Sequence, residues 1–440
     1  MTPPSLLTPA HLRECHDCGS IQRLPEMPPD ARAACPRCDA VLRHTRADPF
    51  TVPLALNVTA LILFAVGSLF TLMSVNTAGQ FRDASLVTGP EQLVGFGFWE
   101  LSVVVLATTM LAPLARIACM IVVLGGLRLR YRPRGVRALF AWVEYLRPWS
   151  MVEIFLLGLF VAFVRLSSLV HLDPGPAVLA LAAFTIVVVA ADLLLDPVAV
   201  WEALDAQKPR RPETPRRMTT GTGKPIRIGC DTCGLVTRGM EGTPCPRCSF
   251  TLHHRKPGGL AVPWALVIAA AVLYVPANLY PFLTVIRFGA GEPSTILNGV
   301  RELLEAGMWP LALLVFFASV AVPVLKLVGL SVLLIATKRK GARRDLTILY
   351  RIVDSVGRWS MIDVFMESIL VALVRFGTVV TISPGPGALA FSAVVILTIF
   401  ASRAFDPRLL WDALATEETM PEPWSKAPPP PDIRTETSPA

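Results

Sequence analysis

The feature that most constrains this chain is a series of apolar segments, several of which reach about twenty residues. A helix of roughly that length crosses the hydrocarbon core of a bilayer. Hydrophobic residues make up 53% of the 440 residues and charged residues only 17%, whereas a soluble protein carries about 25% charged residues. The sequence therefore predicts a mainly α-helical, polytopic membrane protein.

The apolar segments occur in two copies that are related by a constant offset. Pro148–Phe155 reads PWSMVEIF and Arg358–Phe365 reads RWSMIDVF, so each copy places an acid just inside an apolar run. The offset of 210 positions also relates Pro53 to Pro263, Trp99 to Trp309, Pro113 to Pro323, Arg116 to Lys326, Asp196 to Asp406 and Trp201 to Trp411. Because each copy has an even number of predicted spans, we expect two tandem repeats in the same orientation.

Each repeat is predicted to contain four transmembrane helices. The eight spans lie near residues 52–75, 98–126, 149–170, 176–195, 261–286, 308–336, 359–382 and 384–404. A tight turn at Asp173–Pro176 is expected to join the third span to the fourth. Basic residues gather in short loops beside them: Arg128, Arg130, Arg132, Arg134 and Arg137, then Lys338, Arg339, Lys340, Arg343 and Arg344. Such loops indicate the cytoplasmic side rather than nucleic-acid binding. We therefore expect both termini in the cytoplasm and the loops 76–97 and 287–307 outside.

A set of four cysteines precedes each repeat. Cys15, Cys18, Cys35 and Cys38 form two CxxC pairs separated by sixteen residues, and Cys230, Cys233, Cys245 and Cys248 form two pairs separated by eleven. The first fifteen residues lack the apolar core of a signal peptide, so we expect reduced thiols that bind metal. Each set predicts a zinc ribbon with one structural Zn²⁺. Metal-free thiols, a rubredoxin-like iron site and a redox-active dithiol are the alternatives.

These elements divide the chain into seven expected parts. They are a disordered N-terminus (1–14), zinc ribbon 1 (15–46), transmembrane repeat 1 (50–204), a linker (205–224), zinc ribbon 2 (225–256), transmembrane repeat 2 (260–414) and a disordered tail (415–440). The linker and the tail are rich in proline, which is typical of irregular segments.

Several polar residues lie within the predicted spans of the second repeat, at similar depth. They are Ser319, Lys326, Ser360, Asp363 and Thr398. A lysine inside a bilayer costs about 2.5–3.5 kcal/mol on insertion scales, so it requires a partner, and Asp363 is the predicted one. The counterparts in the first repeat are Thr109, Arg116, Ser150 and Glu153, with Val188 in place of the threonine. There Arg116 and Glu153 are expected to form a fixed ion pair.

The second repeat is the better candidate for a site that changes its protonation, because a buried lysine can lose its proton whereas an arginine stays charged. The alternative interpretation is a structural ion pair that only joins helices. Arg165 and Arg375, near the other ends of their spans, are expected to reach toward lipid headgroups.

The loop before residue 308 is predicted to contain an amphipathic helix. Ser294 or Thr295 can cap it, and Ile296, Val300, Leu303 and Leu304 share one face. Such a helix either lies on the membrane surface or binds a partner protein, and these four residues are the candidate partner-binding face.

The four CxxC pairs, the duplicated Trp-Ser-Met-acid segments and the motifs Pro174-Gly-Pro176 and Pro384-Gly-Pro386 resemble the paraquat-inducible protein A family over residues 12–415. The resemblance implies an inner-membrane protein of Gram-negative bacteria. It also implies a periplasmic MCE-domain partner, and the passage of lipid between the membrane and the tunnel that this partner forms. The first half departs from the family pattern at residues 68–71, where the second half has Asn278–Pro281 and a proline able to kink its first span.

Two other classes of function remain open from the residues alone. One is a proton-coupled secondary transporter of small solutes, which could use the same lysine and aspartate. The other is a zinc-ribbon membrane scaffold or sensor that transports nothing. The sequence does not predict an enzyme, because it shows no nucleotide-binding loop, no nucleophile with a base and no metal site with an open position.

Overall fold

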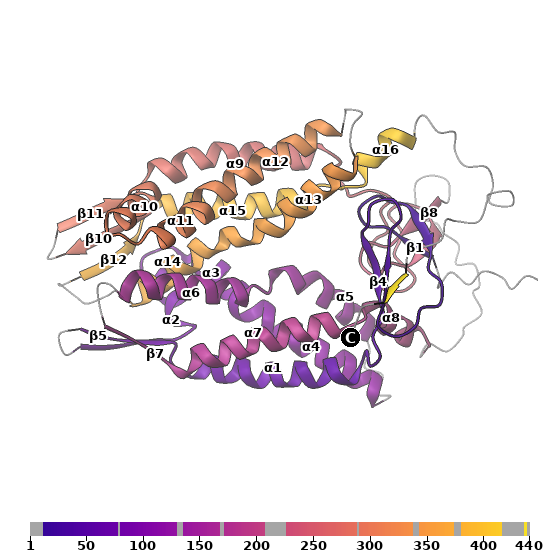
Figure 1. Ribbon diagram of the computed structural model, residues 1–440, viewed down its shortest axis with the longest axis horizontal. Coiled ribbons are helices and arrows are strands. Elements are labelled where there is room, and N and C mark those ends of the chain that lie inside the picture. The colour runs from indigo at the N-terminus through magenta and orange to yellow at the C-terminus, as the bar shows by residue number, and fades with distance from the viewer. Residues whose placement is uncertain are drawn as a thin grey trace, which may run out of the picture.

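The structure is a computed structural model that describes residues 12–77, 80–129, 135–167, 171–206, 226–287, 290–337, 343–373, 380–415 and 435–437. Two bundles of helices lie side by side, one from each half of the chain (Figure 1). Both cysteine-rich modules lie together at one end of the bundles, which we call the ribbon end. Small β-sheets lie at the opposite end, which we call the sheet end (Figure 1).

The two repeats contain the same elements in the same order. Repeat 1 consists of α1 (Thr51–Leu69), β5 (Met73–Thr77), β6 (Gln80–Ala84), α2 (Thr88–Gly95), α3 (Trp99–Leu106), η2 (Ala107–Leu111), α4 (Ala112–Arg128), α5 (Val136–Leu146), η3 (Arg147–Trp149), α6 (Val152–Ser167), β7 (His171–Pro174), α7 (Pro176–Leu194) and α8 (Pro197–Ala206). Repeat 2 consists of α9 (Ala261–Leu279), β10 (Leu283–Arg287), β11 (Ala290–Ser294), α10 (Ile296–Glu305), α11 (Trp309–Phe316), η4 (Phe317–Ala321), α12 (Val322–Ala336), α13 (Arg343–Gly357), η5 (Arg358–Met361), α14 (Ile362–Leu373), β12 (Val380–Pro384), α15 (Pro386–Ala404) and α16 (Leu409–Ala415).

The cysteine-rich modules are built from short antiparallel strands. Ribbon 1 (residues 12–44) contains β1 (Leu12–Glu14), β2 (Ile21–Arg23), β3 (Ala31–Ala34) and β4 (Val41–His44). Ribbon 2 (residues 226–252) contains β8 (Ile226–Gly229) and β9 (Val236–Gly239). The C-terminal strand β13 (Thr435–Thr437) pairs with β3 and so extends a sheet of ribbon 1.

Seven helical segments in the described part are long and apolar enough to cross a membrane: Thr51–Leu69, Trp99–Arg128, Val136–Val164, Pro176–Leu194, Ala261–Leu279, Trp309–Ala336 and Pro386–Ala404. They leave large apolar side chains such as Leu179 and Ile186 exposed, as a lipid-facing surface does. The predicted mainly α-helical, two-repeat membrane fold is confirmed. The remaining predicted span, 359–382, includes residues 374–379, which lie outside the described part.

Prolines shape the long spans in both repeats. A π-helical turn, η2 or η4, ends two residues before Pro113 and Pro323, which lack the N–H that an unbroken α-helix would use. The predicted kink at Pro281 is wrong, because α9 already ends at Leu279 and the proline inside that helix is Pro276. Pro281 instead lies in the segment that leads into β10.

The sheet end carries a three-stranded antiparallel sheet in each repeat, with strand orders β6-β5-β7 and β11-β10-β12. The sequence predicted loops here, but the strands are rich in β-branched residues such as Val285 and Ile382, which pair directly. The predicted tight turn at Asp173–Pro176 is therefore wrong. Gly175 and Gly385 have extended backbones that pass close to the segments leading into β5 and β10, so that an added Cβ would lie 2.1 Å from the carbonyl oxygen of Thr71 or Pro281.

The repeats meet along α6 and α14, the two helices that follow the duplicated Trp-Ser-Met segment. Phe155 and Phe365, which are equivalent in the two repeats, contact each other edge to face with ring centroids 5.8 Å apart. Gly158 allows α6 to approach closely, since an added Cβ would lie 3.2 Å from the carbonyl oxygen of Ile362. One hydrophobic core extends through both repeats at this contact.

Candidate metal centres and membrane polar clusters

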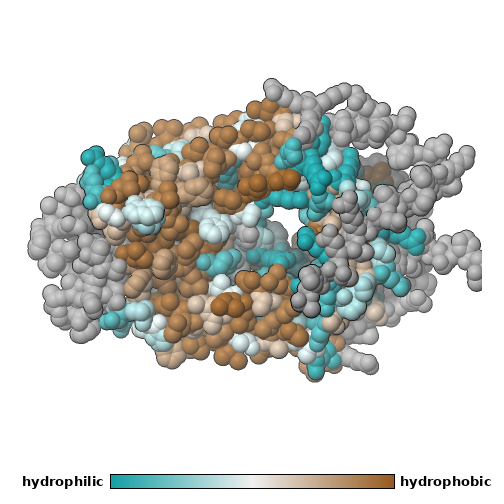
Figure 2. Space-filling view, in the orientation of Figure 1, coloured by the Kyte–Doolittle hydropathy of each residue, from teal (hydrophilic) through white to brown (hydrophobic). Residues whose placement is uncertain are grey.

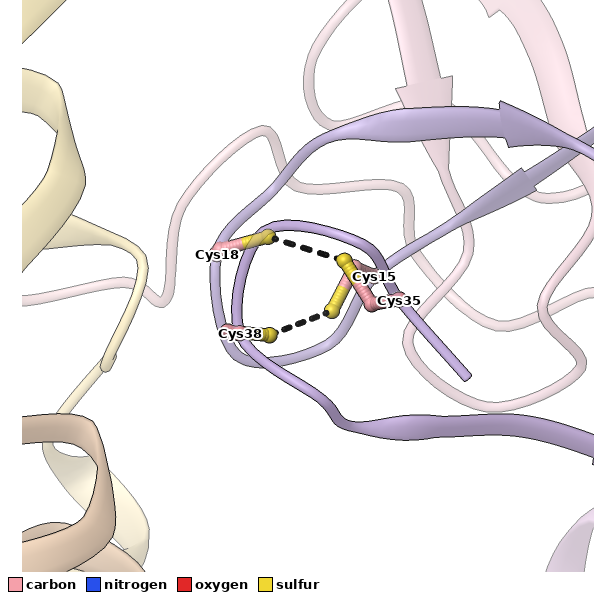
Figure 3. Close-up of side chains that lie close together, drawn as sticks. All are labelled: Cys15, Cys18, Cys35 and Cys38. Atoms are coloured by element: carbon pink, nitrogen blue, oxygen red, sulfur yellow. Dashed lines mark hydrogen bonds between the residues drawn. The ribbon is translucent and has the colours of Figure 1, made fainter. Parts of the chain in front are cut away.

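The eight cysteines form two compact buried clusters. In ribbon 1 the Sγ atoms of Cys15 and Cys38 are 3.4 Å apart and those of Cys18 and Cys35 are 3.7 Å apart (Figure 3). In ribbon 2 the distances are 3.5 Å between Cys230 and Cys248 and 3.7 Å between Cys233 and Cys245. A tetrahedral zinc ion with Zn–S bonds of about 2.3 Å places its sulfur ligands about 3.8 Å apart. Both clusters therefore have the geometry of a four-thiolate metal site.

The backbone forms the same turn at each of the four CxxC pairs. The residue after the second cysteine donates its N–H to the carbonyl oxygen of the first, over 2.8–2.9 Å, and has a positive φ of 56–70°. These residues are Gly19, Asp39, Gly234 and Ser249. Because the turns fix the cysteine backbones, the clusters do not depend on long-range contacts for their local shape.

Each ribbon packs mainly against the repeat that does not directly follow it in the chain. The cysteines of ribbon 1 share a hydrophobic cluster with repeat 2, including Leu330, Phe405 and Trp411. The cysteines of ribbon 2 share a cluster with repeat 1, including Phe140 and Trp201. The docking is therefore crosswise, and no feature of the sequence predicted it.

Ion pairs strengthen the crosswise docking. Arg351 of α13 contacts Asp17 of ribbon 1 at 2.6 Å and donates to the carbonyl oxygen of Cys38 at 2.9 Å. Arg247 of ribbon 2 contacts Asp205 of α8 at 2.7 Å. Ribbon 1 also contacts repeat 1, because Arg43 lies 3.2 Å from Asp196. The ribbons thus connect the two repeats at one end.

Arg408 is the centre of this network. Its buried guanidinium lies 2.9 Å from Asp406, 3.1 Å from Glu14 of ribbon 1 and 3.1 Å from Asp231 of ribbon 2. Burial works against its charge, but the carboxylates outweigh burial and raise the pKa of Arg408. Burial also works to raise the pKa of Asp406, but the hydrogen bonds and charge of Arg408 dominate and lower it. Burial raises the pKa of Glu14 in spite of Arg408.

A polar cavity of about 1100 Å³ lies between the ribbons and the two repeats. Its wall includes Glu14 and Asp231 of the ribbons, Arg147 of repeat 1 and Asp354 of repeat 2. The space-filling view shows an opening between the two apolar halves near the ribbon end, with hydrophilic residues beside it (Figure 2). Water and polar groups can therefore reach the space between the repeats from the ribbon end.

The predicted polar residues of repeat 2 are all buried, with at most 3% of each residue exposed: Ser319, Lys326, Ser360, Asp363 and Thr398. Ser319 and Asp363 line the same small cavity of about 20 Å³, and the Thr398 hydroxyl donates to the carbonyl oxygen of Val395 at 2.9 Å. Among the described residues there is no ion pair between Lys326 and Asp363.

The Lys326 ammonium instead lies against the backbone at the end of α13. A Cβ added at Gly357 would lie 2.5 Å from its Nζ, and the charges that act on it are those of Asp354 and Arg403. Its Nζ is buried and has no hydrogen-bond partner within the part of the chain that the structure describes. Asp354 accepts a hydrogen bond from Ser402 at 3.2 Å.

Glu367, one turn after Asp363 on α14, is a further acid that was not among the predicted site residues. Only 1% of this residue is exposed, and among the described residues neither carboxyl oxygen has a hydrogen-bond partner. Leu157 stands at the equivalent position of repeat 1. A second acid four residues after the first, within an apolar run, was the signal that could have identified it.

The predicted pairing in repeat 1 also differs from the structure. Arg116 forms its ion pair with Asp192 near the end of α7, an acid that the sequence analysis did not single out. Arg116, Ser150 and Glu153 do come together, since all three line one cavity of about 410 Å³. Thr109 lies apart from them and donates to its own helix, at Val105.

The predicted amphipathic helix is present as α10, and the Thr295 hydroxyl caps it by accepting from the Asn298 N–H at 3.3 Å. Its predicted docking face is not available to a partner. Ile296, Val300 and Leu303 are buried in the core of the protein, and of the four residues only Leu304, at 54%, is exposed. The apolar face packs inward because the neighbouring span α11 and the core of its own repeat cover it.

Parts of two other predictions fall outside the described residues. Arg130, Arg132, Arg134, Lys338, Arg339, Lys340 and Arg375 are not described, and neither is the side chain of Arg165. Arg128, Arg137, Arg343 and Arg344 are described, and they border the ribbon end of α4, α5, α12 and α13. Most of the expected linker, residues 207–224, is likewise outside the described part.

The fold and the two cysteine clusters define a class: a polytopic membrane protein made of two tandem repeats, each preceded by a ribbon that can hold a metal ion. The chain belongs to the paraquat-inducible protein A family, whose sequence model matches residues 50–205 and 260–415. The matched ranges are the two membrane repeats.

Curated relatives extend this likeness over almost the whole chain. The chain is 34% identical to the Intermembrane transport protein PqiA of Escherichia coli, over 90% of this chain and 95% of the relative. It is 31% identical to the Lipophilic envelope-spanning tunnel protein A of E. coli, over 91% of each, and 24% identical to a Probable intermembrane transport protein of Haemophilus influenzae, over 92% of this chain and 96% of the relative. No solved structure matches the chain. These relatives are named as transport or tunnel proteins, not as enzymes.

Proposed function

We propose that this chain is the inner-membrane component of a lipid transport system, and that it passes lipid between the inner membrane and a periplasmic tunnel formed by an MCE-domain protein. The observation that carries the proposal is its similarity, over nine-tenths of the chain, to proteins named for intermembrane transport and for an envelope-spanning tunnel. In this arrangement the ribbon end and both termini lie in the cytoplasm. The sheet end then faces the periplasm.

The proposed working site is the polar cluster of repeat 2. Its five predicted residues are buried, and the Lys326 ammonium has no hydrogen-bond partner among the described residues. A buried lysine without a hydrogen-bond partner can release its proton more readily than Arg116, which forms an ion pair with Asp192. We infer that Lys326 and Asp363 act together in a proton-coupled step, with Glu367 as a second acid on the same helix.

The two cysteine clusters are proposed to hold one structural Zn²⁺ each. The four thiolates of each site have tetrahedral spacing and are buried, so they offer a closed coordination shell. In this role the ions stabilise the ribbons, and the ribbons hold the ends of the two repeats together. Catalysis by the metal is not part of the proposal.

The partner is proposed to bind at the sheet end. The exposed face of α10 offers Leu297 and Leu304, which are two helical turns apart and 51% and 54% exposed. On the same helix Arg301 and Glu305 form an exposed ion pair at 2.7 Å. This face, rather than the buried one, is the surface that an MCE-domain protein could cover.

Transfer of labelled phospholipid from proteoliposomes to the purified MCE-domain partner tests the function. We expect Lys326→Ala and Asp363→Ala each to abolish transfer while both variants still insert. Ser331→Ala is the control, because Ser331 lies on the same helix as Lys326 and only donates to Leu327 of that helix. Full transfer by both alanine variants would leave the cluster with a structural role, and no transfer by the wild type would exclude lipid as the cargo.

A further inference from the structure

The cavity of about 410 Å³ in repeat 1 has the character of a ligand site. It lies between α4, η3, α6 and α7, and its size falls within the usual range of about 300–1000 Å³ for small-molecule pockets. Its polar wall consists of Arg116, Arg147, Ser150, Glu153, Thr185 and Asp192. Phe184, Val188 and Val189 form an apolar wall beside it.

The two arginines of this cavity have spare capacity to bind an anion. The Arg116 side chain is only 9% exposed, and while one of its nitrogens contacts Asp192, its Nε is buried without a hydrogen-bond partner among the described residues. A buried donor without an acceptor is unfavourable, so a ligand that brings an acceptor stabilises this site. Arg147 is 45% exposed and lies 3.7 Å from the same carboxylate. Two guanidinium groups around one carboxylate suit the several oxygens of a phosphate group.

The mouth of the cavity suits a ligand with apolar chains. Val189 and Leu193 lie on the lipid-facing surface of the membrane span α7, where they are 48% and 62% exposed. Arg147, Asp192 and Leu193 also line the large polar cavity at the ribbon end, so the two cavities adjoin. A ligand here can place a polar head between the arginines and its chains along α7.

We propose that this cavity binds the phosphate group of a membrane phospholipid between Arg116 and Arg147, with the acyl chains along Val189 and Leu193. The choice of a lipid rather than a soluble phosphate compound rests on the proposed function. The site belongs to repeat 1 alone, because Gly357 and Ser402 stand at the positions equivalent to Arg147 and Asp192. The two repeats thus have different roles: repeat 1 binds the lipid headgroup, and repeat 2 contains the buried lysine.

Photocrosslinking of the full-length protein in membranes that contain ³²P-labelled phospholipid tests the site. A photoreactive residue is placed at Val188 inside the cavity, or at Ile186, which is 71% exposed on the same helix and does not line the cavity. We expect Arg116→Gln and Arg147→Gln each to lower labelling at position 188 about tenfold, since each removes a charge-assisted hydrogen-bond donor. Arg116→Lys should lower it less. Labelling at position 186 should not change.

Arg128→Gln is the matched control, because Arg128 is on the same helix as Arg116 but contacts Thr51 instead. Unchanged labelling at position 188 in both glutamine variants overturns the proposal. If phospholipid does not label the wild type at position 188, the site holds no lipid and the proposal is overturned. Loss of the label in millimolar inorganic phosphate supports binding through the phosphate group, because the two then compete for the same arginines. Should Arg116→Gln fail to insert, the half-exposed Arg147 still provides the test.

Labelling is measured without transport, so the two proposals can fail separately. Normal labelling with no lipid transfer counts against the proposed function alone. If Arg116→Gln or Arg147→Gln loses the label but still transfers lipid normally, the lipid site lies outside the transport route.

Discussion

The Lys326 ammonium lies directly against the backbone of Gly357, where an added Cβ would come within 2.5 Å of its Nζ. The glycine has helical backbone angles, φ −58° and ψ −27°, so it is not needed for its conformation. Its role is to leave space for the lysine. This contact joins α12 to α13 at the depth of the buried cluster.

Gly357→Ala should therefore displace the ammonium without breaking a helix. Overpacking costs about 1–3 kcal/mol, and because the lysine side chain can shift we expect the lower end for stability. Lipid transfer should fall about tenfold, the effect of about 1.4 kcal/mol on the transport step. Gly125→Ala is the control, since nothing lies within 4 Å of a Cβ added there. Equal transfer by both variants would show that the lysine position is unimportant.

Metal removal should affect the opposite repeat because the ribbons dock crosswise. Metal analysis should find about two equivalents per chain, and Cys35→Ser should remove one of them. Hydrogen exchange should then increase in α13 and α16 of repeat 2, which contact ribbon 1 through Arg351 and Trp411. Cys245→Ser should instead affect α5 and α8 of repeat 1. Faster exchange only in the repeat that follows the altered ribbon would contradict this docking.

The buried ion pair of Asp406 and Arg408 should make stability depend on pH. The pKa of Asp406 is lower in the folded state, so its ionised form stabilises the fold above its unfolded pKa of about 4. This contribution is lost as the pH falls through the folded pKa. Asp406→Asn should cost less at pH 7 than the loss of about 3–5 kcal/mol that is usual when a buried charge is left unpaired, because Glu14 and Asp231 remain beside Arg408.

Thermal unfolding in detergent over a range of pH measures this effect. The difference between wild type and Asp406→Asn should be constant near neutral pH and shrink below pH of about 4. Asp412→Asn is the control, because Asp412 is 41% exposed and its pair with Arg255 is worth less than about 1 kcal/mol. A difference that grows at acid pH would have the wrong sign for this explanation.

Two sets of substitutions distinguish the exposed face of α10, proposed to bind the partner, from its buried face. Leu297→Asp combined with Leu304→Asp should weaken co-purification with the MCE-domain protein, while the melting temperature stays within a few degrees. Val300→Asp should instead lower the melting temperature, because it buries an acid among Ile296 and Leu303. Unchanged co-purification by the exposed-face double variant would place the partner elsewhere on the sheet end.

Topology can be tested by labelling with a membrane-impermeant maleimide in spheroplasts. Cysteines at Asp83 and Glu305, exposed residues at the sheet end, should react from outside. A cysteine at Arg344, which is 63% exposed at the ribbon end, should react only after the membrane is opened. The reverse pattern would invert the proposed orientation.

The sequence predicted the repeated unit, most spans and the cysteine pairing, because these depend on local composition and short spacings. Eight thiols in four CxxC pairs allow few ways of grouping cysteines such as Cys15 and Cys230 into metal sites. The sheets were missed because their strands, such as Thr435–Thr437 and Met73–Thr77, have only three to five residues and pair over long distances. Short strands of this kind are hard to distinguish from loops.

Side-chain pairing inside the membrane was the least predictable part. Equal depth suggested Asp363 for Lys326 and Glu153 for Arg116, but depth says nothing about which helices are neighbours. Asp192 contacts Arg116 because α7 lies beside α4 and η3 around one cavity. The same limit applies to α10, whose amphipathic pattern correctly predicted a helix but could not show whether protein, lipid or a partner covers Ile296 and Val300.

Crosswise docking has a consequence for how such a chain can arise. A single ribbon with one repeat would find the main docking surface for its ribbon only on a second copy of itself, as in a domain-swapped homodimer. Fusion of two such copies in one gene would preserve that reciprocal exchange within a single polypeptide. Proteolytic cleavage between residues 207 and 225 should then leave two fragments that remain interlocked through their ribbons.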